Sequence, residues 1–330
     1  YHQAKGLTEK GHDVLLIAAE GTAASFQNTK VKVIEVGKGD VVTGSSREKV
    51  SGGFVESSRK LRLEVVYLSQ AAEKLVQLKD QYDVILNNMR GEAVFLPLAK
   101  LLGKPFANVM HLNLFPELAE LFLEFKTHVI SISNAQRKDF PNLNYLATAY
   151  NGVDVDKFAF NPKPSDYLLM MGTIGRHKNQ GEAIAVAKEL GMKLVLAGKI
   201  RDQDYFEELK KDIDGEKIKY LPEIGFEEKL KLYQNAKAFI FPINWEEPFG
   251  LVMIEAMSCG TPVVAFNRGA VKEVLSDGLT GYVVDNHSQM VEAIKKIDSI
   301  KRETCRKYVE ANFTVAKMVD SYEHALLSLK

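Results

Sequence analysis

An α/β protein with parallel sheets in two domains is the fold class that this sequence predicts. Short buried-strand patterns alternate along the chain with helical ones, and such alternation is typical of strand–helix–strand units, which build parallel, doubly wound sheets. The chain has 330 residues, more than a single hydrophobic core usually organises. Hydrophobic residues make up 46% and charged residues 26% of it, as in ordinary globular proteins.

The first half of the chain opens on a helix that ends near residues 11–13. Residues 37–58 are rich in Gly, Ser and charge, which predicts a mobile loop. The basic residues Lys38, Arg47 and Lys49 in it are either solvated or available to an acceptor. Further strands are expected at 14–18, 31–36, 83–87, 106–110 and 128–133, and further helices at 61–78 and 92–102.

The second half repeats the alternation after a segment, 161–166, whose composition is that of an interdomain linker. Strands are expected at 167–171, 193–198, 217–221, 238–242, 263–265 and 278–284. Helices are expected at 183–190, 228–235, 250–259, 288–297, 302–311 and 315–329. The last of these carries an apolar stripe at helical spacing, so it should pack on another part of the chain.

The residues from Glu247 to Pro262 carry the strongest functional signal. A helix should begin near Gly250 and end before Gly260, because Gly followed by Pro is a C-terminal helix signal. Glu255 is the sole charged side chain of this apolar helix. It is either a structural salt-bridge partner or, together with Glu247 and the unpaired N–H groups of the first helical turn, part of a site for a ligand with phosphate and hydroxyl groups.

Two further candidates lie where predicted strands end, which is where open parallel sheets bind their ligands. The turn after strand 167–171 contains Gly172, Arg176 and Lys178, and such a turn suits a diphosphate or is simply a solvated basic loop. His111 follows strand 106–110. It is either a surface histidine with local partners or a ligand contact.

The stretch Glu247-Pro248-Phe249-Gly250-Leu251, with Glu255-Ala256-Met257 and Gly260-Thr261-Pro262-Val263-Val264, resembles the Glu-x7-Glu signature of retaining glycosyltransferases of family 4. This resemblance implies the GT-B fold, with two Rossmann-like domains facing a central cleft. It implies an acceptor-side domain over residues 1–152, a nucleotide-sugar domain over 153–312, and a helix over 313–330 that crosses back to the first domain. It also implies that the family's first strand and Gly-rich loop would precede Tyr1.

The resemblance assigns roles to individual residues. Lys178 falls on a lysine that binds the donor diphosphate, whereas Thr173 replaces the family's arginine, and Arg176 is a hypothetical substitute. Glu273 matches a family glutamate, although a capping or helix-surface carboxylate would look the same. The implied catalytic residues are Glu247, His111 and Lys178, and the implied donor-binding residues are Gly172, Thr173, Arg176, Ile224, Phe249, Gly250, Leu251 and Glu255.

The activity implied by the resemblance is transfer of a hexosyl group from a nucleoside-diphosphate sugar, with a uridine diphosphate sugar favoured, to a small-molecule, glycan or lipid acceptor. In this family the acceptor attacks from the face that the leaving group vacates, the anomeric configuration is retained, and neither metal nor cofactor is needed. Two alternatives share the fold: a sugar-nucleotide epimerase and a catalytically silent nucleotide-sugar-binding subunit, which the Thr173 departure keeps open.

Composition narrows the remaining possibilities. Basic and acidic residues both number 43, which gives no indication of nucleic-acid binding. The two cysteines, Cys259 and Cys305, lack metal-ligand spacing and suggest the reducing cytoplasm. No apolar run has the roughly 20 residues of a membrane span, although peripheral membrane contact stays open. Asp154 and Asp156 form an Asp-x-Asp without a third carboxylate, so we expect no metal site, and Asp202 is expected to cap a helix.

Overall fold

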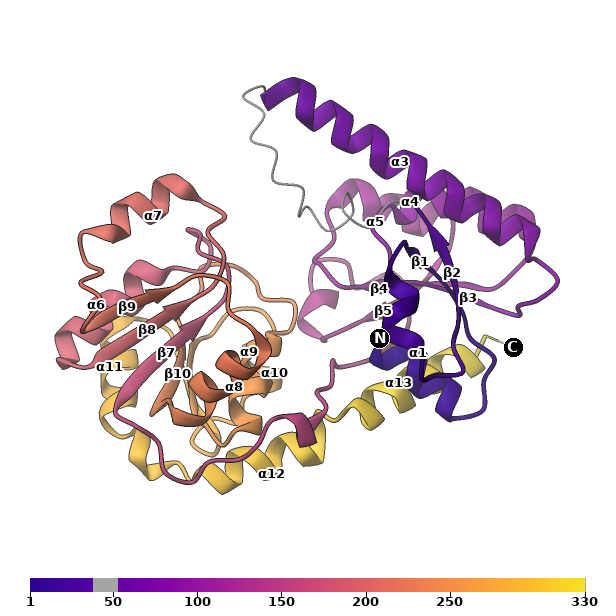
Figure 1. Ribbon diagram of the computed structural model, residues 1–330. Coiled ribbons are helices and arrows are strands. Elements are labelled where there is room, and N and C mark those ends of the chain that lie inside the picture. Colours follow the sequence, from indigo (N-terminus) through magenta and orange to yellow (C-terminus); the bar gives the residue numbers. More distant parts are fainter. Residues whose placement is uncertain (38–52, 330) are drawn as a thin grey trace. The chain divides into compact units, whose positions relative to one another are not determined.

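The computed structural model describes residues 1–37 and 53–329, which form two compact units (Figure 1). Unit 1 comprises the described residues of Tyr1–Ser131, Phe140–Ala149 and Val319–Lys330. Unit 2 comprises Ile132–Asp139 and Tyr150–Met318. The basic residues Lys38, Arg47 and Lys49 lie outside the described residues. In the described ranges, every helix is too short or too polar to span a bilayer.

Unit 1 contains a four-stranded parallel sheet in the order β3-β4-β5-β6 and a two-stranded parallel sheet of β1 and β2. Two of its elements, α5 and β6, lie in segments where no helix or strand was predicted. In chain order the elements are α1 (His2–Glu9), β1 (Leu15–Ala19), η1 (Thr22–Phe26), β2 (Lys32–Val36), α3 (Gly53–Gln77), β3 (Ile85–Asn87), α4 (Glu92–Leu102), β4 (Phe106–Met110), α5 (Pro116–Glu124), β5 (His128–Ser131) and β6 (Asn144–Thr148).

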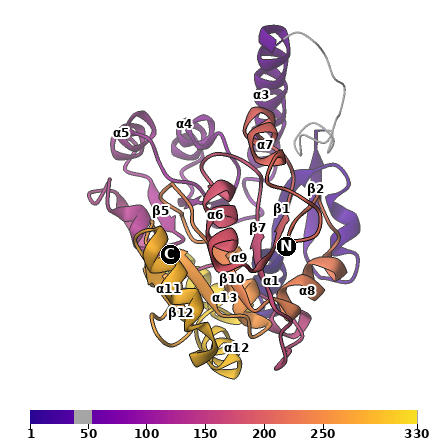
Figure 2. The same cartoon turned by 90° about the vertical axis from the view of Figure 1, so that its left-hand side faces the viewer.

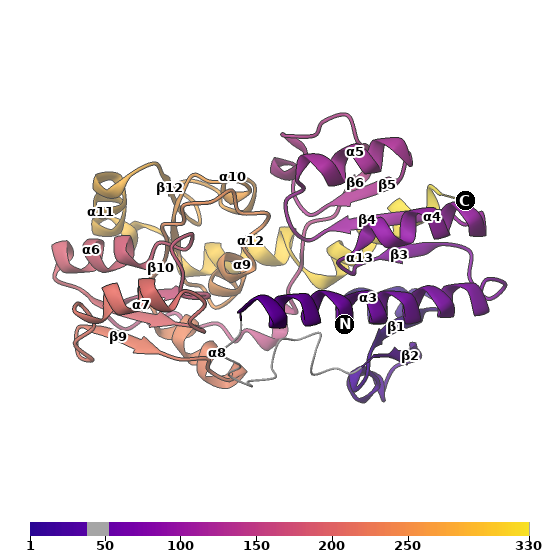
Figure 3. The ribbon, with the colours of Figure 1, turned by 90° about the horizontal axis from the view of Figure 1, so that it is seen from above.

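The core of unit 1 lies between its two sheets and the helices α3, α4 and α5, which cover one face of the strands (Figure 3). Phe95 of α4 and Phe122 of α5 are buried there with Phe106 of β4. The helix α13 (Val315–Leu327) joins unit 1 through its second half. A Cβ added to Gly6 of α1 would come within 2.4 Å of Val319 Cγ2, so the two helices pack closely.

The helix α3 begins earlier than the sequence pattern suggested. Residues 53–58 were expected to belong to a loop, but α3 already starts at Gly53. The serines and glycines around residue 50 suggested that the loop continued to residue 58. Residues 56, 59 and 60 are Glu, Arg and Lys, which are good helix formers. They allow the helix predicted by the apolar pattern from Leu61 onward to start earlier in the chain.

Unit 2 contains a six-stranded parallel sheet in the order β12-β11-β10-β7-β8-β9. From β7 the chain builds outward through β8 and β9, then returns to the other side of β7 for β10. Between β7 and β10, therefore, the direction of strand addition reverses. In open α/β sheets a crevice that can hold a ligand forms at the carboxyl end of such a reversal.

Most elements of unit 2 match the ranges expected from the sequence to within a few residues; α7 was expected only through its cap at Asp202, and α10 and the short 3-10 helices were not given ranges. Its helices are α6 (Gln180–Leu190), α7 (Gln203–Lys210), α8 (Phe226–Asn235), α9 (Leu251–Ser258), α10 (Val271–Val274), α11 (His287–Lys295) and α12 (Arg302–Asn312). Its strands are β7 (Tyr167–Met171), β8 (Lys193–Ala197), β9 (Ile218–Leu221), β10 (Ala238–Phe241), β11 (Val263–Phe266) and β12 (Gly281–Val284). The short turns are η2 (Ala135–Arg137), η3 (Val155–Lys157) and η4 (Ile297–Ser299).

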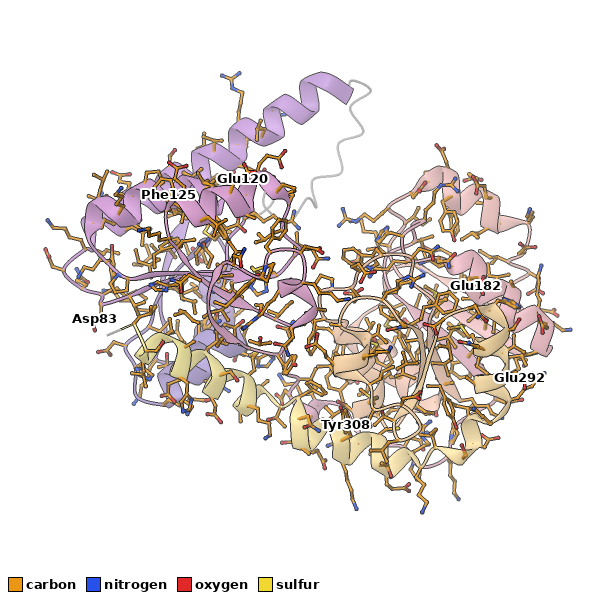
Figure 4. The ribbon with its side chains drawn as sticks, turned by 180° about the vertical axis from the view of Figure 1, so that it is seen from behind. Asp83, Glu120, Phe125, Glu182, Glu292 and Tyr308 are labelled. Carbon is orange, nitrogen blue, oxygen red and sulfur yellow. The ribbon has the colours of Figure 1, made fainter. Side chains whose placement is uncertain are left out.

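Helices cover both faces of this sheet (Figure 2). On one face α6 packs against α11, and on the other α9 packs against α8 and α12. His287 at the start of α11 contacts two carboxylates of α6, Glu182 at 2.8 Å and Glu189 at 2.8 Å; Figure 4 labels Glu182 among the side chains of this layer. With helices on both sides the central strands are apolar on both faces, and all four residues of β10 are buried.

The segment 161–166 is not a linker between the two units, because it lies within unit 2. Asn161 Nδ2 donates hydrogen bonds to the carbonyl oxygens of Lys163 and Gln234, and Asn161 N–H donates to Cys259 O. The prolines and polar residues that suggested a linker thus form a tethered surface loop ahead of β7.

Candidate active site at the carboxyl edge of the six-stranded sheet

The two loops at the reversal point of the sheet are bound to each other. One follows β7 and the other follows β10, and these strands are neighbours in the sheet. Asn179 Nδ2 donates to Pro242 O at 2.9 Å, and Asn244 N–H donates to His177 O at 2.9 Å. Asn179 has a φ of +62°, a conformation that asparagine tolerates better than most residues. Side chains far apart in sequence therefore meet here.

The centre of this edge is an ion pair between Lys178 and Glu247. Lys178 Nζ lies 2.8 Å from Glu247 Oε2, with 16% and 11% of the two side chains exposed. The sequence predicted both residues as site residues, 69 positions apart, and the structure brings them together. Opposite charges that shield each other from water in this way stabilise one another far more than they would on an exposed surface.

Two aromatic rings complete the surroundings of this pair. Trp245 Nε1 donates a hydrogen bond to the same Glu247 Oε2 at 3.0 Å. Lys178 Nζ lies 4.7 Å from the centroid of the Trp245 ring and 5.4 Å from that of Phe241. A cation this close to aromatic faces is attracted by their quadrupoles. Trp245 was not among the predicted site residues, although it stands two residues before Glu247.

The loop after β11 also contacts Glu247, through its backbone. Ala270 N–H donates to Glu247 O at 2.9 Å, and Gly269 N–H donates to Glu246 Oε2 at 2.7 Å. A Cβ on Gly269 would come within 2.3 Å of Glu247 O, so this close approach requires glycine. The loop after β11 thereby fixes the backbone from which the Glu247 side chain projects.

The helix α9 begins at Leu251, directly after the loop that follows β10, as predicted. Gly250 precedes it with φ +89°, and a Cβ there would come within 2.4 Å of Met253 Cε. No described side chain caps this end of the helix, and first-turn N–H groups lack intrahelical acceptors. Phe249 is buried, whereas Leu251 is 45% exposed. The backbone of these predicted residues offers donors next to the Lys178–Glu247 pair.

Glu255, the second carboxylate of the signature, has its own set of partners. Lys229 Nζ of α8 lies 2.8 Å from Oε1, and the Tyr233 hydroxyl donates to Oε2 at 2.9 Å. Burial, together with the negative charge of Glu255, raises the pKa of Tyr233 well above its usual value. This is the structural salt bridge that the sequence left open as one alternative for Glu255.

The remaining donor-side predictions occupy less central positions. Arg176 is exposed and held by α7: its Nη2 lies 2.5 Å from Glu208 Oε1, and its guanidinium carbon lies 5.1 Å from the Tyr205 ring centroid. Thr173 is partly buried, and its carbonyl accepts from Gln180 Nε2 at 3.0 Å. Gly172 has a φ of +152° with open space where a Cβ would point. Ile224 is partly exposed in the turn after β9.

In unit 1, His111 follows β4 as expected, and it lies beside a residue that follows β3. Its Nε2 is 2.9 Å from Asn88 Oδ1, and His111 as a whole is exposed. Desolvation by neighbouring atoms lowers the pKa of His111, which favours the neutral imidazole near pH 7. In a neutral imidazole one ring nitrogen donates a hydrogen bond and the other accepts one.

Glu273 binds a segment that the sequence did not connect with it. Its carboxylate accepts hydrogen bonds from Asn134 N–H at 2.8 Å and Ala135 N–H at 2.6 Å, and from the Tyr150 hydroxyl at 2.8 Å. Burial and this carboxylate raise the pKa of Tyr150. Glu273 therefore caps the short helix η2, which lies far from it along the chain. A capping carboxylate was one of the alternatives that the sequence left open for this residue.

Asp154 and Asp202 each have a partner close by in the sequence. Asp202 caps α7 by accepting from Tyr205 N–H at 3.0 Å, as predicted. Asp154 precedes η3 and lies 3.5 Å from Lys157 Nζ. Within the ranges 1–37 and 53–329, no three His, Cys, Asp or Glu side chains are grouped as metal ligands.

Comparison with known proteins identifies related sequences and folds. Residues 154–314 match the family model of Glycosyl transferases group 1. Glycogen synthase of Mycobacterium tuberculosis is 30% identical over 152 residues, which are 43% of this chain and 36% of the relative. The O-antigen chain mannosyltransferase RfbU of Salmonella typhimurium is 27% identical over 159 residues, 47% of this chain and 45% of the relative. The chain thus matches less than half the length of these relatives.

Solved structures match over nearly the whole chain. The structure of Anabaena Alr3699/HepE in complex with UDP and glucose has a TM-score of 0.76 at 18% identity, covering 99% of this chain and 94% of that one. Sucrose-phosphate synthase from Thermosynechococcus elongatus has a TM-score of 0.72 at 16% identity, covering 99% and 92%. The protein therefore has the α/β fold with two parallel-sheet domains of the GT-B glycosyltransferases, and its residues 154–314 match Glycosyl transferases group 1.

Proposed function

We propose that the protein is a glycosyltransferase that uses a nucleoside-diphosphate sugar as donor. The observation that carries this proposal is the Lys178–Glu247 ion pair at the reversal point of the six-stranded sheet, beside the start of α9. A cation, free backbone N–H groups and a carboxylate meet there, and these are the groups that bind a diphosphate and a hydroxyl-rich ring. The UDP and glucose bound by the Anabaena protein support a uridine donor.

The leaving diphosphate gathers negative charge as its bond to the anomeric carbon breaks. Lys178 and the N–H groups of residues 249–251 stabilise that charge, with Arg176 contributing if it leaves Glu208. Because the backbone N–H groups at the start of α9 are fixed by the fold before the reaction, they cost little reorganisation. The proposal therefore assigns leaving-group stabilisation to the protein itself, without a metal ion or cofactor.

Glu247 orients the sugar hydroxyls and stabilises positive charge that develops at the anomeric carbon. We propose that the acceptor attacks from the face that the diphosphate leaves, so that configuration is retained and the departing phosphate takes the acceptor proton. Glu255 is assigned to the ribose, the backbone at Ile224 to the base, and His111 to the sugar or the acceptor. The acceptor is a small molecule, a glycan or a lipid.

Donor binding tests this proposal first. The wild-type protein is heated with uridine, guanosine and adenosine diphospho-sugars in turn, and the melting temperature is recorded, because a ligand that binds only the folded state raises it. One nucleotide series should raise the melting temperature, and that donor should then release its nucleoside diphosphate when a panel of acceptors is added. A C2 epimer formed without acceptor would identify an epimerase instead, and binding without turnover on any acceptor would identify a binding subunit.

A further inference from the structure

Two hydrogen-bond donors converge on one oxygen of a nearly buried carboxylate. Glu247 is 9% exposed, and its Oε2 accepts from both Lys178 Nζ at 2.8 Å and Trp245 Nε1 at 3.0 Å. Trp245 reaches Lys178 as well, because the ammonium lies 4.7 Å from the centroid of its ring. One half-buried tryptophan thus contacts both members of the ion pair.

The proposed function creates a conflict for this pair. Lys178 has to bind the donor diphosphate, yet in the protein alone its ammonium is engaged by Glu247. If Lys178 turned to a phosphate and nothing replaced it, Glu247 would keep a negative charge with little access to water. Leaving a buried charge without a partner is strongly unfavourable, so the carboxylate would compete with the donor for Lys178.

Resting on the proposed function, we propose that Trp245 is a positioning residue that allows Lys178 to exchange Glu247 for the donor diphosphate. The indole N–H remains on Glu247 Oε2 when Lys178 leaves, so the carboxylate keeps a donor and its orientation. The ring of Trp245 keeps the ammonium near the site during the exchange. The ring of His177 lies edge-on to that of Trp245 with 5.7 Å between centroids, so it packs against the indole.

A double-mutant cycle on nucleoside-diphosphate binding tests this exchange. Trp245→Phe keeps an aromatic ring and removes the N–H, whereas Glu247→Gln removes the charge that needs a substitute donor. Binding of UDP, GDP and ADP is measured by calorimetry for the wild type, both single variants and the double variant. We expect Trp245→Phe to weaken binding about tenfold when Glu247 is present and by less than about twofold when it is Gln.

A matched control and the contradicting outcomes complete the cycle. Tyr282→Phe removes the hydroxyl of a tyrosine on β12 that hydrogen-bonds with Ser299, so it should leave nucleotide binding unchanged. An equal loss from Trp245→Phe in both backgrounds would show a purely structural tryptophan and overturn the inference, as would no loss at all. If no nucleotide binds the wild type, the proposed function itself fails, which is a distinguishable result.

Tryptophan fluorescence of the wild type gives a second measurement, with Lys178→Met as its comparison. Trp245 is the only tryptophan in the sequence, so the emission of the wild type reports on its surroundings alone. A saturating nucleoside diphosphate should change the emission intensity as Lys178 moves from Glu247 to the phosphates and its position over the ring changes. The change should be absent in Lys178→Met at concentrations where calorimetry shows the variant to be saturated. Unchanged wild-type emission at saturation would overturn the exchange.

Discussion

The two carboxylates of the signature, Glu247 and Glu255, have closely similar surroundings and differ in one respect. Each contacts a lysine ammonium at 2.8 Å and an aromatic donor, the Trp245 indole at 3.0 Å or the Tyr233 hydroxyl at 2.9 Å. At Glu255 the two donors take one oxygen each. At Glu247 both take Oε2, and Oε1 has no hydrogen-bond partner among the described residues.

This difference leaves Glu247 with an oxygen available to a ligand, whereas both oxygens of Glu255 already have partners. An ionised carboxylate has about four acceptor positions on its two oxygens, and a free, oriented oxygen can accept from a sugar hydroxyl. Glu255 joins α8 to α9 through both oxygens and supports the helix whose first turn borders the site. Its proposed contact with the ribose would have to share oxygens that already have partners.

The largest effect should come from removing the charge of Glu247. Glu247→Gln keeps the shape of the side chain but loses the negative charge that stabilises the anomeric carbon, so we expect kcat to fall about a hundredfold to a thousandfold. The assay measures nucleoside-diphosphate release with the donor and the acceptor that emerge from the melting-temperature and acceptor screens described under Proposed function. If Glu255→Gln lowered kcat more than Glu247→Gln, the distinction between the two carboxylates would be reversed.

The two lysines should differ in the same way. Lys178→Met should weaken nucleoside-diphosphate binding about 10- to 100-fold, because a charged hydrogen bond to phosphate is lost. Lys229→Met is the matched control, with the same side-chain change at the other carboxylate, and it should alter binding by less than about threefold. Calorimetry measures both, and equal losses would mean that the lysines do not have separate roles.

Glu255 should matter more for stability than for binding. Tyr233→Phe removes the hydroxyl donor from Glu255 Oε2 in a fully buried side chain, so the free energy of unfolding should fall by about 1–2 kcal/mol. Urea denaturation followed by circular dichroism measures it. Tyr145→Phe, which removes a hydroxyl bonded to Phe140 O in unit 1, serves as a partly buried control with a smaller expected loss.

The turn between the two carboxylates should tolerate little change. Gly250→Ala places a Cβ at φ +89° and against Met253 Cε, so we expect a loss of about 1–2 kcal/mol in the free energy of unfolding. Gly278→Ala is its control, since Gly278 also has a positive φ, +73°, but nothing lies within 4 Å of the added atom. Equal losses at both positions would show that backbone strain accounts for the whole effect.

The smallest effect is expected at Arg176. Its guanidinium must leave Glu208 and Asp202 before it can reach a phosphate, which offsets part of what it would contribute. Arg176→Ala should therefore weaken donor binding by no more than about tenfold, less than Lys178→Met. Unchanged affinity would contradict the idea that Arg176 replaces the arginine that Thr173 displaces.

The sequence predicted most strands and the helix α9, and the resemblance named Lys178 and Glu247 separately as site residues. That the strands preceding them are neighbours, and that the two side chains pair, came from the structure. The α5 segment was overlooked, although Pro116 at its first position and the apolar residues that follow are helix signals, and β6 is short and partly polar. Strand and helix periodicity is a local signal, and it weakens in segments this short.

Side-chain partners were beyond the sequence for a different reason. The attachment of Arg176 to Glu208, of Glu273 to residues 134 and 135, and of both Trp245 and Lys178 to one oxygen depends on rotamers and loop geometry. Those are set by packing between elements distant along the chain, such as the loop whose Gly269 supports Glu247. Spacing in the sequence contains no information about them, so the difference between Glu247 and Glu255 emerged only from the structure.

The most direct test of the central claim is a crystal structure with the nucleoside diphosphate that binds most tightly. The account predicts phosphate oxygens within hydrogen-bonding distance of Lys178 Nζ and of the first N–H groups of α9, with Trp245 still donating to Glu247. A nucleotide bound elsewhere on unit 2, with the Lys178–Glu247 pair intact, would contradict it.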